Sequence, residues 1–151
     1  MILDIAYTQH RGTDWRYPVQ QDALWNSVEV IQSRNRLPAG LQTHADVISL
    51  AVADGLGGTP QAERASRTVL EELAAAIQGG ALFDRGLVRR IHARLCDRLA
   101  FGETIGSATT LAAVQIHGER CAGVCVGDSR VCRLSSRGEW VQLSRDHNVL
   151  N

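Results

Sequence analysis

The apolar run 46–53, which ends abruptly at Asp54-Gly55, constrains the fold of this chain more than any other segment. A run of this length bounded by turn residues predicts a strand that is buried on both faces. Such a strand places Asp54 at the edge of the core, where a carboxylate must be hydrated, paired or bound to a cation. The glycines that follow leave the Gly55 carbonyl open to close approach. The segment therefore predicts part of an oxygen-ligand site for a hard cation.

Composition places the chain among ordinary globular proteins. Its 151 residues suffice for one domain, spanning 1–151, and are too few for two. Basic and acidic residues balance at 16 each, so no net field favours nucleic acid or an anionic membrane. The N-terminus lacks the basic and apolar regions of a signal peptide. We expect a cytoplasmic protein whose cysteines are reduced packing residues: Cys96, Cys121, Cys125 and Cys132.

The remaining pattern predicts strands, then two helices, then strands. Strands are expected at 2–7 and 22–32, with Asn26-Ser27 as a break, and a loop at 34–43 because it contains Pro38 and Gly40. The first helix would follow Thr59 as N-cap and end at Gly79-Gly80, and the second would start near Asp84. An antiparallel meander is expected at 109–116, 121–126, 129–134 and 140–143. This order predicts a layered α+β domain and not an alternating βαβ sheet.

Acidic residues recur where these expected strands end, at Asp22, Asp54, Asp128 and Asp146. Each one alone is typical of a turn. Together on a strand-rich scaffold they indicate a cation site, because converging carboxylates repel one another unless a cation holds them.

Two other site chemistries fail on spacing. A dinucleotide-binding loop starting at Gly55 would need glycine where Pro60 stands, and no Lys-Ser/Thr pair supports a P-loop. A serine hydrolase using Ser129 would need a second glycine in the nucleophile elbow and a helix after it.

Four motifs in order resemble one known family. They are Asp54-Gly55-Leu56-Gly57-Gly58, Gly106-Ser107-Ala108-Thr109-Thr110-Leu111, Gly127-Asp128-Ser129-Arg130 and Gln142-Leu143-Ser144-Arg145-Asp146-His147. Their sequence and intervals resemble the metal-dependent type 2C (PPM) serine/threonine protein phosphatases in their bacterial form. The resemblance implies a layered α-β-β-α sandwich with two Mn²⁺ or Mg²⁺ ions at one end and a third, weaker metal site.

The resemblance also implies roles for individual residues. Asp54 matches the aspartate that bridges both metals, and Gly55 matches the residue that offers its backbone carbonyl. Asp22 matches the second acidic residue of an N-terminal pair near the metals, and Asp128 the aspartate of the third site. Arg16 resembles the arginine that grips the substrate phosphate, although a surface arginine in a loop fits it equally well. The implied reaction is hydrolysis of phosphoserine and phosphothreonine on proteins by a metal-activated water, opposing a Ser/Thr kinase.

The chain departs from the family pattern in two places. The spacing from Arg16 to Asp22 is one residue longer than usual, with neutral Gln21 before the aspartate. The chain also ends at Asn151, before the further strands, helices and two metal-binding aspartates of the family. We therefore expect a phosphatase-like domain that is C-terminally incomplete, with weak metal binding, poor turnover and uncovered apolar faces.

Two alternatives to the enzyme remain at this point. The chain could be a non-catalytic relative that binds a phosphoprotein, or an unrelated Mg²⁺- or nucleotide-binding α+β domain. Downstream aspartates in the reading frame would favour the enzyme, and ATP titration with and without Mg²⁺ would identify the unrelated domain.

Overall fold

The computed structural model describes residues 2–81 and 83–147. Its elements, in chain order, are β1 (Leu3–His10), β2 (Asp22–Trp25), β3 (Val30–Ile31), β4 (Asn35–Thr43), β5 (Val47–Asp54), α1 (Ala62–Gln78), α2 (Arg85–Leu99), a 3₁₀ turn (Gly102–Thr104), β6 (Leu111–His117), β7 (Arg120–Val126), β8 (Cys132–Leu134) and β9 (Trp140–Gln142).

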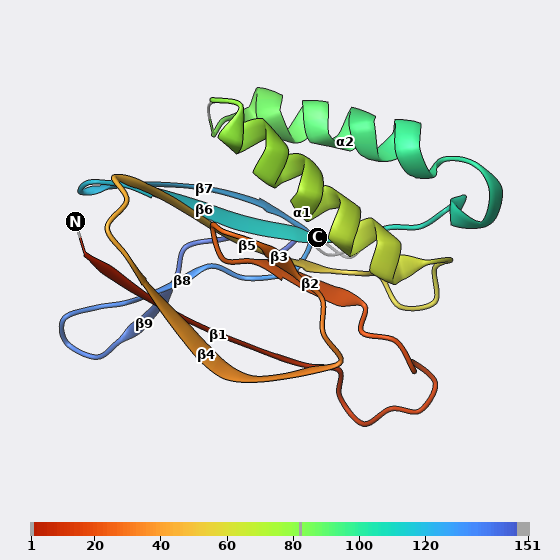
Figure 1. Cartoon of the computed structure of the whole chain (residues 1–151), viewed down its shortest axis with the longest axis horizontal. Helices are drawn as coiled ribbons and strands as arrows, with labels where there is room; N and C mark the ends of the chain where they lie inside the picture. The colour runs from red at the N-terminus through yellow and green to blue at the C-terminus, as the bar shows by residue number, and fades with distance from the viewer. Residues whose placement is uncertain (1, 82, 148–151) are drawn as a thin grey trace.

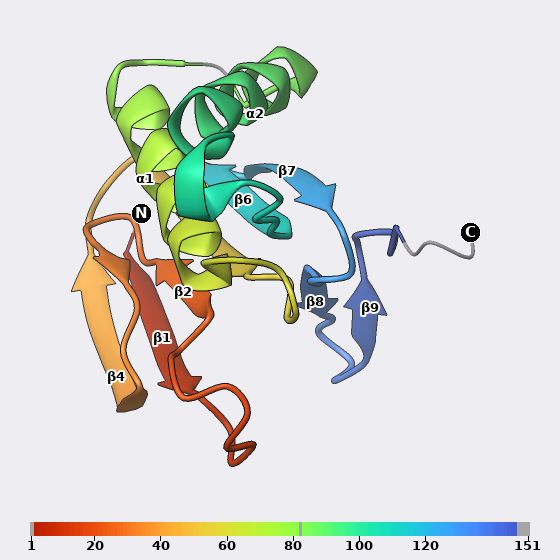
Figure 2. The same ribbon diagram turned by 90° about the vertical axis from the view of Figure 1, so that its right-hand side faces the viewer.

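The molecule is layered. A five-stranded antiparallel sheet, in the order β3-β2-β5-β6-β7, carries both helices on one face (Figure 1). The two-stranded ladders β1-β4 and β8-β9 lie on the other side of that sheet, separate from each other (Figure 2). This arrangement confirms the predicted layered α+β class. The three layers are the two helices, the five-stranded sheet and the two-stranded ladders, and the described residues contain no second helical layer.

Apolar residues at helical spacing join α1 to the sheet. Ala62, Ala65, Val69 and Leu73 are buried on one face of the helix, as their spacing predicts. Val69 and Leu73 belong to one core cluster with Ala51, Ala53 and other sheet residues, and the small alanines allow the helix to approach the strands closely. From α2, Leu87 and Ile91 join the same core. This core holds β5 in the centre of the sheet.

Strand β5 forms as predicted but is not buried on both faces. Ala51 and Ala53 face the helices and are 5% and 1% exposed, whereas Val52 on the opposite face is 45% exposed. Val52 lines an apolar groove between the five-stranded sheet and the β1 and β8 region. Its exposure agrees with the expected uncovered apolar faces.

The prediction of a loop at 34–43 is wrong, because this segment forms strand β4, which pairs antiparallel with β1. Pro38 lacks a backbone N–H and would interrupt a central strand. Here β4 is an edge strand, and the register shifts between Tyr7 and Gln9, opposite the proline. The Thr8 hydroxyl donates to the Arg36 carbonyl at 2.8 Å within this bulge. Edge position and bulge together accommodate the proline.

One helix boundary and the pairing of the last strands differ from expectation, while the start of α2 agrees with it. Helix α1 begins at Ala62 after a left-handed Gln61, without a side-chain cap, because the Thr59 hydroxyl instead donates to the Leu56 carbonyl at 2.7 Å. Helix α2 does start next to Asp84, which is its N-cap and whose carboxylate accepts the Leu87 N–H at 2.7 Å. The C-terminal meander is split, since β8 pairs with β9 and not with β7.

The four cysteines are free, as expected, but three of them are not core residues. Cys96, Cys121 and Cys132 are exposed, and Cys125 is half-buried. Among the helices of the described residues, none has both the length and the apolar character that crossing a membrane requires.

Candidate functional site

The structure brings Asp22 and Asp54 together. They are direct partners in the antiparallel pairing of β2 with β5, so their side chains leave the same face of the sheet side by side. Both line a groove of about 310 Å³ together with Gln9, His10 and Ser129. Asp22 is half-buried and Asp54 is exposed. Strand β2 and the central strand β5 thus deliver two carboxylates to one opening.

This pairing is electrostatically unfavourable without a cation. Partial burial, the neighbouring charge of Asp54 and a hydrogen bond with that carboxyl raise the pKa of Asp22 to about 6. No arginine forms an ion pair with either carboxylate among the residues that the structure describes. A bound divalent cation would relieve the repulsion and favour the ionised form of Asp22.

Gly55 is required by close packing and not by an unusual backbone angle. A Cβ atom at this position would lie 2.4 Å from the Ala62 carbonyl oxygen and 2.8 Å from that of Gln21. The Gly55 N–H donates to the Gln21 carbonyl at 3.1 Å, which ties the residue to the β2 side of the site. Glycine therefore allows the start of α1, the segment before Asp22 and the end of β5 to meet.

Two threonines hold the backbone of Asp54. The Thr110 hydroxyl accepts the Asp54 N–H at 2.9 Å, while the Thr109 hydroxyl and the Thr110 N–H both donate to the Asp54 carbonyl at 2.9 Å. The Thr110 hydroxyl also lies 2.6 Å from that of Ser129, and a Cβ at Gly127 would meet Thr110 at 2.7 Å. The motifs around Asp54, Thr109-Thr110 and Gly127-Asp128-Ser129 are thus one packed unit.

A buried amide supports Asp22 from β1, and sequence reasoning missed it. The Gln9 side chain is 8% exposed, donates to the Asp22 carbonyl at 3.0 Å and accepts the Ser33 N–H at 2.8 Å. Ser66 of α1, fully buried, donates to the Gln21 carbonyl at 2.5 Å. Burial of a glutamine on a strand cannot be read from composition, so the available signal was only its place on the inward face of β1.

Arg16 lies in the loop that approaches the glycine segment, but it does not line the groove. Its guanidinium makes a two-pronged ion pair with Asp14, with Nη2 at 2.7 Å from Oδ2, and its side chain is 68% exposed. The next residue, Tyr17, packs its hydroxyl 3.3 Å from where a Cβ of Gly57 would stand. Arg16 therefore lies in the loop beside the glycine segment, and its guanidinium is paired with Asp14.

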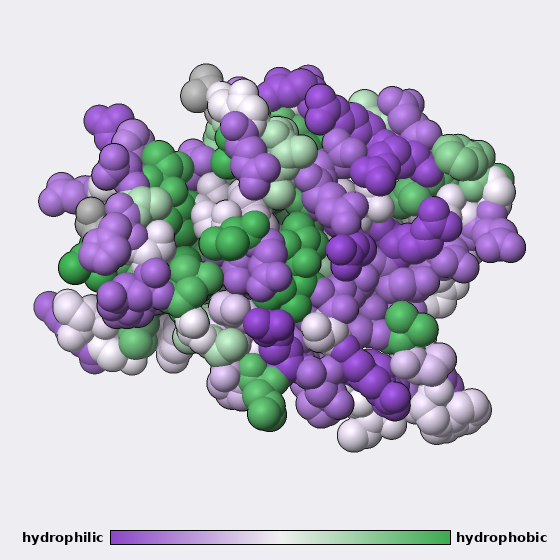
Figure 3. Space-filling view, in the orientation of Figure 1, coloured by the Kyte–Doolittle hydropathy of each residue, from purple (hydrophilic) through white to green (hydrophobic). Residues whose placement is uncertain are grey.

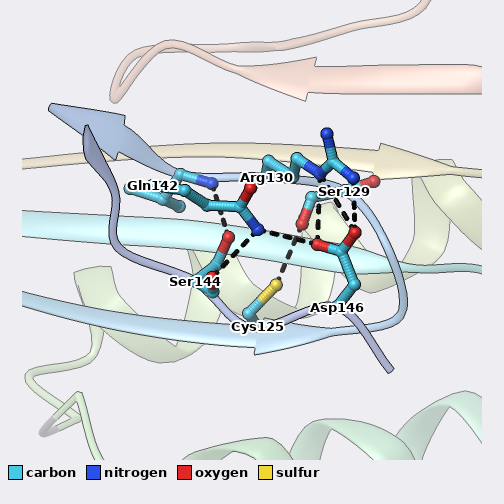
Figure 4. Close-up of polar contacts among 7 residues, drawn as sticks. Cys125, Ser129, Arg130, Gln142, Ser144 and Asp146 are labelled. Carbon is cyan, nitrogen blue, oxygen red and sulfur yellow. Dashed lines mark hydrogen bonds and ion pairs between the residues drawn. The ribbon is translucent and has the colours of Figure 1, made fainter. Parts of the chain in front are cut away.

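Asp128 lies beside the groove and not in it. Its neighbour Ser129 lines the groove, and the Gly127 carbonyl accepts the His147 N–H at 2.9 Å. Around it, Arg130 makes a two-pronged ion pair with Asp146, and the Cys125 thiol donates to the Ser129 carbonyl (Figure 4). The hydrogen bond from Arg130 lowers the pKa of Asp146. These contacts join the third and fourth sequence motifs.

The oxygen atoms at this site suit part of the coordination shell of a divalent cation. Carboxylates of Asp22 and Asp54 with the Gly55 carbonyl are the oxygen donors that Mg²⁺ and Mn²⁺ prefer. Among residues 2–81 and 83–147, no cluster of three or more His, Cys, Asp or Glu side chains forms a metal site. The described residues thus provide two charged ligands and leave the rest of a coordination shell open.

A family model described as protein phosphatase 2C matches residues 37–150. The match covers most of the chain and includes the Asp54, Thr109-Thr110 and Asp128 segments just described. The chain belongs to the protein phosphatase 2C family. No match was found among curated proteins.

Solved structures of this phosphatase family share the fold. The Mycobacterium tuberculosis serine/threonine phosphatase PstP/Ppp is 22% identical with a TM-score of 0.64, and covers 99% of this chain and 56% of its own. A PstP catalytic domain in complex with two manganese ions is 23% identical with a TM-score of 0.67, and the match covers 99% of this chain and 57% of that one. Staphylococcus aureus Stp1 is 20% identical with a TM-score of 0.68, and the match covers 97% of this chain and 54% of that one. The chain thus spans a little over half the length of these structures.

Proposed function

We propose that this chain provides part of the metal site of a metal-dependent phosphatase that hydrolyses phosphoserine and phosphothreonine on proteins. The observation that carries the proposal is the direct pairing of Asp22 with Asp54 across β2 and β5. No described residue forms an ion pair with either carboxylate, and partial burial together with the neighbouring charge of Asp54 raises the pKa of Asp22. Family membership and a manganese-containing structure of the same fold support the cation as Mn²⁺ or Mg²⁺. Residues 1–151 would act as a single phosphatase-like domain.

In this proposal Asp54, Asp22 and the Gly55 carbonyl hold the metal, and Asp128 contributes to a weaker third site. When bound, such ions lower the pKa of a water and stabilise charge on the phosphoryl oxygens. Thr109 and Thr110 fix the backbone of Asp54, and Gln9 fixes that of Asp22. Arg16 would have to leave Asp14 to grip a phosphate, which is feasible because exposed ion pairs contribute little.

The substrates would be phosphoproteins made by a Ser/Thr kinase. With two charged side-chain ligands, we expect weak metal affinity and slow turnover for this chain.

The test is Mn²⁺ binding by calorimetry together with Mn²⁺-dependent hydrolysis of an aryl phosphate. Asp54→Asn and Asp22→Asn should each weaken Mn²⁺ binding by about tenfold or more, since each removes one charged ligand. Asp46→Asn is the matched control, because Asp46 is exposed at the opposite end of β5. Unchanged Mn²⁺ affinity in Asp54→Asn would contradict the proposal.

The second candidate is a non-catalytic phosphatase-like module that binds a phosphorylated partner. It is favoured by the absence of a third ligating side chain near Asp22 and Asp54 among the described residues. Mn²⁺ binding without any hydrolysis, combined with retention of a phosphopeptide, would select this candidate.

A further inference from the structure

We propose that α2 is a docking face for an acidic segment of a partner protein. The chain has no lysine, so all 16 of its basic residues are arginines. Five of them lie on the 15 residues of α2, against the single acidic residue Asp97. This helix therefore carries four net positive charges in a chain whose net charge is zero.

The arginines form two rows along the exposed side of the helix. Arg85 and Arg89 are four residues apart, as are Arg90, Arg94 and Arg98, so each row lies on one line along the helix. All five are exposed. In Figure 3, hydrophilic side chains cover the upper right of the molecule, where Figure 1 places α2.

Some of these arginines are held in place and others are free. Glu72 of α1 accepts from Arg94 at 3.2 Å and from Arg98 at 2.9 Å. Arg85, Arg89 and Arg90 form no ion pair with any described residue. The fold thus anchors one end of the helix and leaves three guanidinium groups available to an outside ligand.

The surface beside Arg90, one of the three free arginines, is hollowed. Arg90 and Arg94 line a cleft with Gly79, Gly80 and neighbouring small residues at the end of α1. Small residues let an extended peptide approach the backbone, while guanidinium forks bind carboxylates with two parallel hydrogen bonds. Both features suit a short acidic peptide.

Charge distribution favours an acidic protein segment over nucleic acid. Outside α2 the chain carries four net negative charges, so a long polyanion extending beyond the helix would meet repulsion. A short acidic segment can be confined to the helix and the cleft. The proposal is independent of metal binding at Asp22 and Asp54.

The experiment measures fluorescence anisotropy of labelled oligoglutamate with the full chain at low and moderate salt. Arg85→Gln/Arg89→Gln/Arg90→Gln removes the three free arginines and leaves the Glu72 ion pairs intact. It should weaken binding by about tenfold or more, because each lost guanidinium removes a charge-assisted contact. The matched control is Arg120→Gln/Arg133→Gln/Arg137→Gln, which removes the same charge from exposed positions on and near β7 and β8. Its affinity should stay within about twofold of the parent.

A third variant guards against a folding defect and separates charge from geometry. Arg85→Lys/Arg89→Lys/Arg90→Lys keeps the charge and should recover part of the affinity. Equal losses in the Gln variant and its control, absence of saturable binding by the parent, or no difference between the Lys and Gln variants would overturn the proposal. Tighter α2-dependent binding of an oligonucleotide or an anionic vesicle than of the peptide would also overturn it.

Discussion

At the scale of the residue, the site is defined by one cross-strand pair of like charges. Asp22 and Asp54 are exposed enough to meet a ligand and close enough to repel each other. Around them, Gly55 admits no side chain, and Thr110 and Gln9 fix the backbone of the pair. The residues nearest the chemistry are thus arranged at a cost in stability that a cation would offset.

The raised pKa of Asp22 predicts an unusual pH dependence for the metal-free chain. Its folded pKa of about 6 lies above the ordinary value of 3.8. Between these values the folded state binds more protons than the unfolded state, so the free energy of unfolding falls as pH rises through this window. Asp22→Asn removes that penalty and should raise the free energy of unfolding by about 1 kcal/mol at pH 7.5, less than the full pKa shift corresponds to because solvent screens a half-buried carboxylate, with little change near pH 3.5.

Urea denaturation in the presence of a chelator measures this effect at both pH values. Asp46→Asn should leave both midpoints unchanged. A destabilised Asp22→Asn variant at pH 7.5 would show that the carboxylate is satisfied without metal.

At the scale of the element, periodicity predicted most strands and both helices. It did not predict which strands pair, because the pairing partners lie far away in sequence. The segment 34–43 reads as a loop because Pro38 and Gly40 break local patterns, yet pairing with β1 makes it a strand. The expected Thr59 cap is absent because that hydroxyl bonds the Leu56 carbonyl. The first error arose because a tertiary pairing overrode a local preference, and the second because a local turn engaged the hydroxyl that would have capped the helix.

One carboxylate that sequence reasoning passed over adds two ion pairs to the apolar contact between the helices. The side chain of Glu72 is 14% exposed and accepts from Arg94 and Arg98. Burial acts to raise its pKa, but the hydrogen bonds from Arg98 and Arg94 prevail and lower it. Glu72→Gln weakens both bonds and should lower the free energy of unfolding by about 1 kcal/mol.

The matched control for this change is Glu71→Gln. Glu71 makes one exposed ion pair with Arg67 on the same helix, so its loss should cost no more than about 0.5 kcal/mol. Urea midpoints at low salt compare the two variants. Equal effects would mean that the Glu72 pairs contribute no more than an exposed pair.

At the scale of the whole molecule, stability is expected to be uneven. Strands β5 and β6 lie inside the five-stranded sheet under the helical core. The β8-β9 ladder pairs with no other described strand, and Leu134 and Trp140 on it are 53% and 74% exposed. Fewer buried contacts mean a smaller free energy for local opening.

Hydrogen exchange should separate these two regions. Backbone amides of β8 and β9 should exchange at least about a hundredfold faster than those of the β5-β6 ladder, because local opening needs no disruption of the core. Mass spectrometry of exchanged peptides measures the difference. Equal protection of both ladders would show that β8-β9 packs as firmly as the central sheet.

Local sequence was sufficient for the existence of β5, the buried faces of the helices, the start of α2 near Asp84 and the order of the family motifs, because each depends on neighbouring residues. It also indicated Asp22 and Asp54 as members of one site. The direct pairing of Asp22 with Asp54, the hydrogen bonds of Gln9 and Thr110 with their backbones, and the strand at 34–43 could be known only once the chain had folded. These features join residues that are far apart in sequence. They depend on cross-strand register and on burial, and a local sequence pattern encodes neither.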